Sequence, residues 1–437
     1  MIVPLVSAKA ATCGGKAGAL GALLRAGLPV PDGFVLPFAA YRAAVRGLDL
    51  ERLAAEPDRA GTVRRAIEAR PVPAAVPAAV AGALARALGD LGDPPVAVRS
   101  SAAHEDTGQT SAAGQHDSFL AVRGAGAVTD AVRACWASLF TARAVDYRGE
   151  RPLGDLAMAV LVQRHLDAEV AGVMFTPAAP GDATRVEASW GLGPSVVGGT
   201  VTPDAYRVAG DGPVTRVVAR KQTRLDRCGG RLVTSDVPRS DRDRPVIDDA
   251  TARSLAALGT EIAAVRGGPQ DVEWAIADGR VWILQARPLT AETPAWPPSL
   301  TSPPTTPATD TPATDTPATV AAPATSSAAV AMLTGTPGSR GIVTGTARII
   351  RGPRDFERAR PGDIIVCPFT DPAWTPLLRI AAGVVTETGG ALSHAAIVAR
   401  EHGIPAVLGV ANATTRLHDD SAVTVDGATG TVTQAAP

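Results

Sequence analysis

The sequence predicts an α+β protein built from more than one domain. At 437 residues the chain is longer than one ordinary domain and long enough for two or three, each with its own core. A tract rich in Pro, Thr, Ala and Ser separates two stretches that mix helical periodicity with short β-branched runs. We therefore expect domains at residues 1–292 and 332–437, joined by a linker at residues 293–331.

The first stretch shows one clear amphipathic helix and several strands. Residues 17–25 place three leucines on one helical face, and the breakers Gly27 and Pro29 follow. Short runs rich in β-branched residues predict strands at 95–99, 158–163, 170–175 and 281–285. Such a mixture favours an α+β domain.

The second stretch, of about 105 residues, alternates strands and helices in a compact unit. Its apolar and alternating runs predict strands at 341–350, 363–366 and 383–385 and a helix at 391–401.

Composition excludes several classes of protein. Lys and Arg number 42 against 43 Asp and Glu, so there is no bulk charge to hold nucleic acid or an anionic membrane surface. The four cysteines are far apart and form no C-x-x-C pair, which argues against a zinc site or a disulfide framework. The start of the chain lacks a secretory signal pattern, and no apolar run reaches the roughly 18–20 residues of a membrane helix. We expect a cytoplasmic protein that binds neither nucleic acid nor membrane.

The tract at residues 293–331 contains Thr-Pro-Ala-Thr-Asp twice and has few large apolar groups. Such a composition cannot repay the entropy of ordering, so we expect a disordered linker. Nearly 40 residues span about 100 Å as extended polyproline II and about 35 Å as a flexible coil, which allows the flanking domains to move. A glycosylated stalk is the alternative, which the missing signal peptide disfavours.

The segment TETGGALSHAAIVAREHGIPAV, residues 386–407, is the most informative in the chain. A strand ends, two glycines turn the backbone, and a helix begins near His394. Backbone N–H groups and the positive end of the helix dipole can hold a phosphate carried on the imidazole. Small neighbours such as Gly390 and Ala395 leave room for a large phosphorylated group to approach. An imidazole with its usual pKa near 6.5 is mostly neutral in the cell and is then a competent nucleophile.

This segment resembles the phosphohistidine signature of the phosphoenolpyruvate-utilising enzymes, a family that includes phosphoenolpyruvate synthase, pyruvate phosphate dikinase and rifampin phosphotransferase. The resemblance implies that His394 is the phosphorylated residue and that Thr388 and the Gly389–Gly390 turn shape its loop. It also implies that residues 332–437 form a swivelling β/β/α phosphohistidine domain.

Near the N-terminus, Cys-Gly-Gly-Lys-Ala-Gly places Lys16 between glycines before a helix. The segment is not a Walker A loop, because Ala17 stands where that motif needs a magnesium-binding hydroxyl. Arg99 ends a predicted strand and suits phosphate oxygens. Glu273 and Gln285 offer oxygen ligands of the kind that Mg²⁺ prefers beside nucleotide phosphates, although alternating polar residues on a half-exposed hairpin would look the same.

The order of segments such as GGKAGALGALLRAGLPVPDGF, VAVRSSAAHED, MAVLVQRHL, EASWGLG and PQDVEWAIADGRVWILQARPLT resembles the ATP-grasp domain of the same family over most of residues 10–290. That resemblance implies that ATP binds here. It assigns the nucleotide phosphates to Lys16, Arg99 and Arg287, the vicinity of adenine to Gln163, and Mg²⁺ to Glu273 and Gln285.

Asp271 is a weaker candidate beside that metal. The chain departs from the family at Ala112, where Phe is common, and at Pro194 and Thr200, where acidic residues are common.

The implied mechanism is that of a dikinase. His394 attacks ATP, AMP leaves, one phosphoryl group of the pyrophosphohistidine passes to water or phosphate, and the other passes to an acceptor. Family members bind the acceptor with a third unit, and no segment here matches one, so we expect a separate acceptor-binding protein. A stand-alone kinase for a small metabolite or antibiotic, and a regulatory phosphocarrier without a metabolic product, remain the alternatives.

Overall fold

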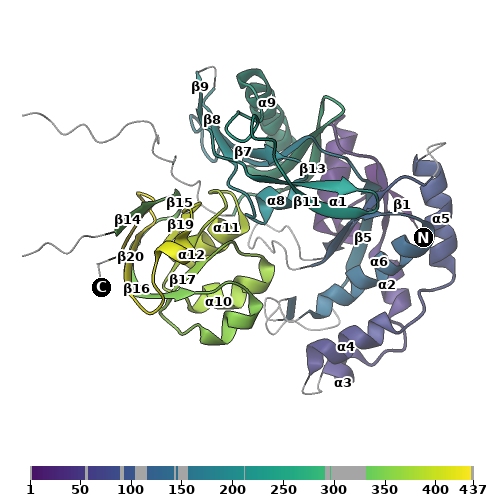
Figure 1. Cartoon of the computed structure of the whole chain (residues 1–437). Coiled ribbons are helices and arrows are strands. Elements are labelled where there is room, and N and C mark those ends of the chain that lie inside the picture. Colours follow the sequence, from purple (N-terminus) through teal and green to yellow (C-terminus); the bar gives the residue numbers. More distant parts are fainter. Residues whose placement is uncertain are drawn as a thin grey trace, which may run out of the picture.

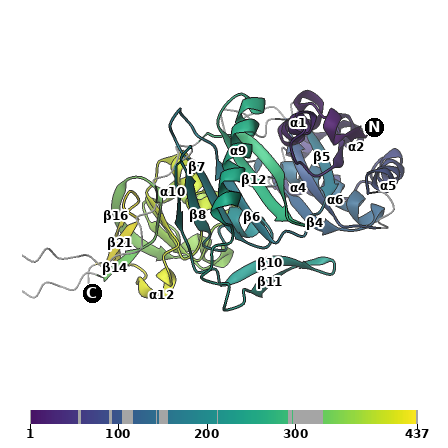
Figure 2. The ribbon, with the colours of Figure 1, turned by 90° about the horizontal axis from the view of Figure 1, so that it is seen from above.

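The computed structural model describes residues 2–54, 58–88, 93–103, 116–141, 144–145, 156–210, 212–290, 296 and 331–434 (Figure 1). Residues 2–290, here the N-terminal region, and residues 331–434, here the C-terminal region, lie side by side in both views (Figures 1 and 2). The expected mixture of helices and strands is confirmed in both regions. Most of the predicted linker, and Ala112, lie outside the described residues.

The first part of the N-terminal region is a five-stranded antiparallel sheet of order β1-β2-β5-β3-β4. Its strands are β1 Val3–Pro4, β2 Gly33–Leu36, β3 Val96–Ala102, β4 Ser118–Val122 and β5 Met158–Arg164. The helices of this part are α1 Ala10–Arg25, α2 Phe38–Ala44, α3 Leu50–Ala54, α4 Arg59–Glu68, α5 Ala75–Leu88 and α6 Ala125–Ala137.

A six-stranded antiparallel sheet of order β13-β12-β6-β7-β8-β9 forms the second part. Its strands are β6 Val170–Phe175, β7 Thr184–Trp190, β8 Asp204–Val208, β9 Val214–Val217, β12 Gln270–Ala277 and β13 Arg280–Pro288. The hairpin β10 Thr223–Cys228 with β11 Arg231–Asp236, and the helices α8 Pro194–Val197 and α9 Asp249–Arg266, complete this part.

Helix α1 begins at Ala10 and not at residue 17 as predicted, and it is kinked at Gly14. Gly14 has a φ of 81°, and a Cβ there would lie 2.2 Å from the carbonyl oxygen of Ser101 on β3. Only glycine meets both conditions. The turn thus lies directly on the strand that carries Arg99.

The C-terminal region is built on an eight-stranded sheet of order β14-β21-β20-β16-β17-β18-β19-β15. Its strands are β14 Ala331–Thr334, β15 Thr336–Ser339, β16 Ile342–Ile349, β17 Ile364–Cys367, β18 Gly383–Thr386, β19 Ala406–Leu408, β20 Ala422–Asp426 and β21 Thr431–Gln434. Strands β16 to β19 pair in parallel. The helices are α10 Thr375–Ile380, α11 His394–His402 and α12 Ala413–Arg416.

Helix α11 connects β18 to β19 and carries His394 as its first residue. It begins three residues later than predicted, because residues 391–393 make other contacts described below. Gly403 ends it in the left-handed conformation, with a φ of 65°.

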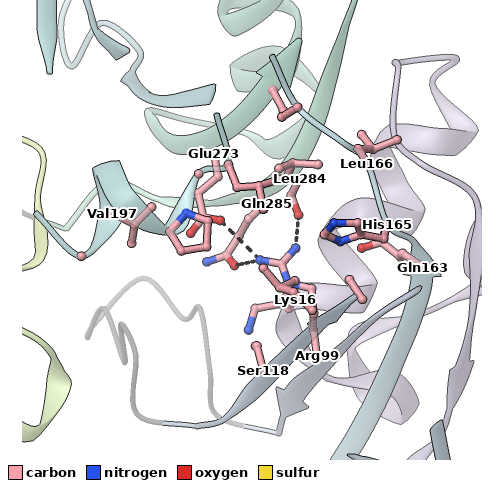
Figure 3. Close-up of a pocket in the computed structure, with 18 of the residues that line it drawn as sticks. Lys16, Arg99, Ser118, Gln163, His165, Leu166, Val197, Glu273, Leu284 and Gln285 are labelled. Atoms are coloured by element: carbon pink, nitrogen blue, oxygen red, sulfur yellow. Dashed lines mark hydrogen bonds and ion pairs between the residues drawn. The ribbon is translucent and has the colours of Figure 1, made fainter. Parts of the chain in front are cut away.

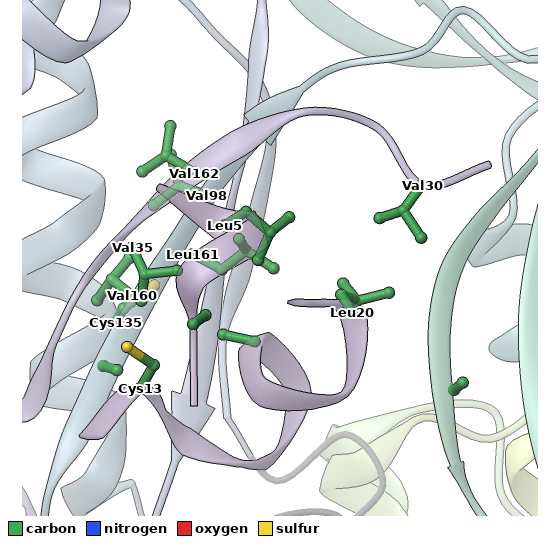
Figure 4. Close-up of a cluster of buried hydrophobic side chains, with 14 of the residues drawn as sticks. Leu5, Cys13, Leu20, Val30, Val35, Val98, Cys135, Val160, Leu161 and Val162 are labelled. Atoms are coloured by element: carbon green, nitrogen blue, oxygen red, sulfur yellow. The ribbon is translucent and has the colours of Figure 1, made fainter. Parts of the chain in front are cut away.

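One apolar core runs through both sheets of the N-terminal region, and a separate core fills the C-terminal sheet. Figure 4 shows part of the first core, where Leu20 of α1, Val98 of β3 and Leu161 of β5 are buried. Helix α1 contacts β3 and β5 of the first sheet and β13 of the second, so it joins the two sheets.

None of the helices that the structure describes is both long enough and apolar enough to cross a membrane.

A fully buried ion pair joins Lys221 to Asp204 at 2.5 Å. The Asp204 carboxylate also accepts the backbone N–H groups of Ala219 and Val246, each at 2.9 Å. Asp204→Asn leaves the buried ammonium unpaired, so we expect the free energy of unfolding to fall by about 3–5 kcal/mol. Thermal and denaturant unfolding of the full chain measure this loss.

The matched control is Asp249→Asn, which removes the exposed pair of Asp249 with Arg216. That change should cost no more than about 1 kcal/mol. Equal losses for the two variants would show that the buried pair does not carry this part of the fold.

Candidate functional site

A cavity of about 640 Å³ opens between the two sheets of the N-terminal region, a size that suits a nucleotide-sized ligand. All six residues expected to contact the nucleotide or the metal line it: Lys16, Arg99, Gln163, Glu273, Gln285 and Arg287, of which the first five are labelled in Figure 3. The C-terminal region also reaches this cavity, through Asp371, Pro372 and Ala373. The walls therefore come from three separate parts of the fold.

Lys16 sits just after the kink of α1 and is buried. Its ammonium donates to the carbonyl oxygen of Ser100 at 3.0 Å, and the N–H of Ala17 donates to the Ser101 hydroxyl at 3.0 Å. Two adjacent residues of α1 are therefore fastened to β3. This attachment holds the lysine at the cavity wall.

Arg99 extends from β3 to the second sheet. One guanidinium nitrogen, Nη2, lies 2.8 Å from Oε1 of Gln285 and 3.4 Å from Oε2 of Glu273 (Figure 3). The other, Nη1, donates to the carbonyl oxygen of Leu284. In this structure Arg99 thus contacts the two residues proposed as metal ligands.

Strands β12 and β13 bring the polar residues of the second sheet together. Glu273 is the register partner of Gln285, and Asp271 is the partner of Arg287. The Arg287 guanidinium donates twice to Oδ2 of Asp271, at 2.9 and 2.7 Å, and both side chains are buried. The hairpin-like pair expected from the sequence is confirmed, and it places an oxygen pair and an ion pair on one face of the sheet.

Gln163 lies on β5, where its side-chain amide donates to the carbonyl oxygen of Pro31 at 2.9 Å. His165 follows it, is also buried, and lines the same cavity. Burial lowers the pKa of His165, so this imidazole is neutral near pH 7.

His394 is buried, with 4% of its surface exposed. Its Nδ1 lies 3.1 Å from the Thr370 hydroxyl, and its Nε2 has no hydrogen-bond partner among the described residues. Burial, and next the positive charge of Arg287, lower the pKa of His394 to about 4. The imidazole is therefore neutral at physiological pH, and the same arginine that lines the cavity acts on it.

The loop before α11 is held by the N-terminal region. The Glu187 carboxylate on β7 accepts the N–H of Leu392 at 3.1 Å and also the N–H of Ala391. The Thr388 hydroxyl donates to Gly199 O at 2.6 Å, and the Gly389 N–H donates to Val201 O at 3.1 Å. An apolar cluster across the same boundary joins residues of both regions: Val173, Phe175, Val196, Val201, Leu392 and Ile397.

The small residues around His394 do not leave open space, contrary to the expectation. A Cβ on Gly390 would lie 2.3 Å from the Glu187 carboxylate, and one on Gly389 would lie 3.6 Å from Gly199. Ala395 and Ala396 are buried against Leu408. In this arrangement the small residues allow the N-terminal region to pack closely against the loop before His394.

Family models match both regions. Residues 10–298 match the one described as pyruvate phosphate dikinase, AMP/ATP-binding domain, and residues 359–430 match PEP-utilising enzyme, mobile domain. The chain belongs to the phosphoenolpyruvate-utilising enzyme family.

Curated members of the family align along almost the whole chain. A protein named probable phosphoenolpyruvate synthase from Methanothermobacter thermautotrophicus is 38% identical over 96% of this chain and 61% of its own length. One of the same name from Archaeoglobus fulgidus is 36% identical over 96% of this chain and 56% of its own length. The chain thus spans less than two thirds of these relatives. A solution structure of Enzyme I matches 18% of this chain and 32% of its own at 32% identity, with a TM-score of 0.17, which is too low to bear on the fold.

Several residues that contribute to the site were not found from the sequence. Glu187 and Asp371 lie far along the chain from the residues that they approach, and Thr370 lies 24 positions before His394. In the sequence, Glu187 occupies a position like any other in an ordinary strand. Only its burial in the structure distinguishes it from a surface carboxylate. Pro194, one of the departures from the family, is the first residue of helix α8, a position that proline favours. It also lines the cavity.

Removal of the Glu187 carboxylate should free the loop before α11. Glu187→Ala leaves the N–H groups of Ala391 and Leu392 without their acceptor, so we expect their hydrogen exchange to accelerate about tenfold or more. Mass spectrometry of peptides that span residues 388–393 measures the rate. The control Asp248→Ala removes the carboxylate that accepts the Thr251 N–H at the start of α9 and should leave this loop unchanged. Unaltered exchange in Glu187→Ala would contradict the contact.

The buried His394 should make stability depend on pH. Its pKa is about 4 when folded and near 6.5 when unfolded, so the unfolded chain binds more protons between these values. Stability should therefore fall as the pH drops from about 6.5 toward 4, and His394→Gln should lessen the fall. Urea unfolding at several pH values tests this expectation, and an NMR titration of His394 near 6.5 would refute it.

Proposed function

We infer that this chain is the charging and carrying part of an ATP-dependent, dikinase-type phosphotransferase. ATP binds in the cavity of the N-terminal region, which we propose folds as an ATP-grasp domain, and His394 accepts phosphoryl groups from it. The C-terminal region is then a swivelling phosphohistidine domain, and the tract after residue 290 tethers it.

One observation carries this inference. Residues 371–373 of the C-terminal region line the cavity, and Thr370, directly before them, lies 3.1 Å from Nδ1 of His394. The segment that reaches the cavity is therefore the one that contacts the histidine. This geometry supports a direct reaction between a ligand in the cavity and the imidazole.

The proposed step begins with a neutral imidazole. A proton on Nδ1, donated to the Thr370 hydroxyl, leaves the lone pair on Nε2, the atom that has no hydrogen-bond partner among the described residues. Nε2 attacks the β-phosphorus of ATP, an Nε2–P bond forms, and the bond from that phosphorus to the α,β-bridging oxygen breaks. AMP leaves with the electron pair, and His394 carries a pyrophosphoryl group.

Lys16, Arg99 and Arg287 supply positive charge where negative charge moves during this transfer. Lys16 is held by β3 and Arg287 by Asp271 of β12, so little reorganisation of these two groups is needed when the charge develops. One phosphoryl group of the intermediate then passes to water or phosphate.

Glu273 and Gln285 fit a magnesium ion. Their side-chain oxygens lie beside one cationic group, Arg99, so the pair already accepts positive charge. Mg²⁺ prefers one or two protein oxygens and takes its remaining ligands from phosphate and water. Within the described residues no three His, Cys, Asp or Glu side chains gather into a metal cluster, which agrees with a site that the nucleotide completes. Bound there, the ion would neutralise phosphate charge.

The acceptor is proposed to be pyruvate or a similar small molecule, bound by a separate protein. Relatives of this chain are named phosphoenolpyruvate synthase. His394 is buried against the N-terminal region, so the phosphohistidine must leave this position to meet any acceptor.

The test uses ATP labelled separately at the β and γ phosphates. Wild-type protein with Mg²⁺ should release AMP and retain acid-labile β label, because the β-phosphorus becomes bonded to Nε2. His394→Ala should retain none and should form AMP at a rate at least 100-fold lower. Thin-layer analysis of nucleotides and acid lability of the protein label are the readouts.

His402→Ala serves as the control, because it replaces the exposed histidine at the opposite end of the same helix. It should charge as wild type does. Absence of AMP from wild type, with and without added phosphate, would overturn the dikinase mechanism. Label that persists in His394→Ala would place the phosphoryl group on another residue.

A further inference from the structure

Arg99 occupies the position where the proposed metal ligands face the cavity. Its Nη2 is 2.8 Å from Oε1 of Gln285 and 3.4 Å from Oε2 of Glu273 (Figure 3). The arginine comes from the five-stranded sheet, whereas both oxygens belong to the six-stranded sheet. The contact therefore bridges the two walls of the cavity.

The charges of this wall are already balanced. Asp271 is paired with Arg287 at 2.7 Å, and Glu273 is paired with Arg99 at 3.4 Å. The side chains of Arg99 and Glu273 are only 13% and 27% exposed, so solvent screens them incompletely. Each carboxylate has its own guanidinium, and no net negative charge remains to attract a divalent cation.

Arg99 and a metal ion cannot hold these oxygens together. A magnesium ion needs oxygen ligands at about 2.0–2.1 Å, in the space that the guanidinium fills. Two cations so close together would also repel each other. The arginine must therefore move before a metal can enter. The triphosphate of a nucleotide offers it a new partner, because guanidinium groups bind phosphate oxygens in a bidentate manner.

We propose that Arg99 is an internal counter-ion that keeps the Glu273–Gln285 pair closed to metal until nucleotide binds. The proposal rests on the proposed function, since it takes the cavity to bind a metal–nucleotide complex. Nucleotide phosphates draw Arg99 away, and the released oxygens take the metal. Metal and nucleotide then bind cooperatively, and by linkage each raises the affinity for the other by the same factor. Arg99 is a positioning residue in this exchange.

The experiment is a Mn²⁺ titration of the full chain followed by electron paramagnetic resonance, which counts free ions and needs no turnover. It is carried out with and without a non-hydrolysable ATP analogue. Wild type should bind Mn²⁺ weakly alone and at least tenfold more tightly with the analogue. Arg99→Gln should bind Mn²⁺ at least tenfold more tightly than wild type without the analogue, and the analogue should add less to that affinity.

Two further variants locate the effect. Arg99→Gln with Glu273→Gln should lose the gained affinity, because the acidic ligand is gone. Arg216→Gln, which removes a surface guanidinium paired with Asp249, should behave as wild type. Circular dichroism of each variant shows that it is folded.

The outcomes separate the two hypotheses. One outcome is that, without the analogue, Arg99→Gln binds Mn²⁺ no more tightly than wild type, while the analogue still tightens binding in wild type. That result overturns the counter-ion role and leaves the metal site intact. A gain that survives Glu273→Gln also overturns it. Failure of wild type to bind Mn²⁺ even with the analogue overturns the metal site of the proposed function as well. AMP formation, tested separately, decides the phosphotransferase mechanism without reference to Arg99.

Discussion

The antiparallel register of β12 and β13 is the constraint on which the site depends. It sets Glu273 against Gln285 and Asp271 against Arg287, so one pairing builds both an oxygen pair and an ion pair. A slip of one strand by one residue would turn its two side chains to the opposite face, because side chains alternate along a strand. The third position of that row is an apolar residue, Val173 on β6.

The same row reaches the histidine. Val173 is also the register partner of Glu187 on β7, and Glu187 accepts N–H groups from the loop that precedes His394. Residues of the nucleotide cavity and the contact with the C-terminal region thus lie along one face of one sheet. Strand pairing consequently fixes the position of the cavity residues Glu273 and Gln285 relative to Glu187, which holds the loop before His394.

Local pattern was enough to find many elements but not the contacts between distant ones. The strands around Arg99, Gln163 and Gln285 were predicted within a few residues, since β-branched runs bounded by turns carry that information. All six proposed nucleotide and metal residues line one cavity. Their roles still rest on family resemblance, because a half-exposed hairpin has the same alternation as a ligand pair. The start of α1 was placed seven residues too late, since the kink at Gly14 looks like the end of a loop.

Contacts across the two regions had no signal in a single sequence. Glu187 and the residues around Gly199 are separated from their partners by about two hundred positions, and nothing local distinguishes Glu187 from a surface carboxylate. For the same reason the glycines near His394 were interpreted as room for a ligand. Their close approach to Glu187 and Gly199 shows that small side chains can serve domain contact as well as substrate access.

The burial of His394 bears on how a carrier domain can work. A neutral imidazole can be buried against the N-terminal region at little cost, and the lowered pKa of His394 reflects that burial. A phosphoryl group on Nε2 would bring negative charge into the same place, where burying an ionised group is costly unless charge and hydrogen bonds compensate it. Arg287 is already paired with Asp271 and offsets that cost only in part. Under the proposed function, phosphorylation of His394 therefore weakens the contact between the two regions that brought the imidazole to the nucleotide. The negative charge of the phosphoryl group then favours release of the C-terminal region.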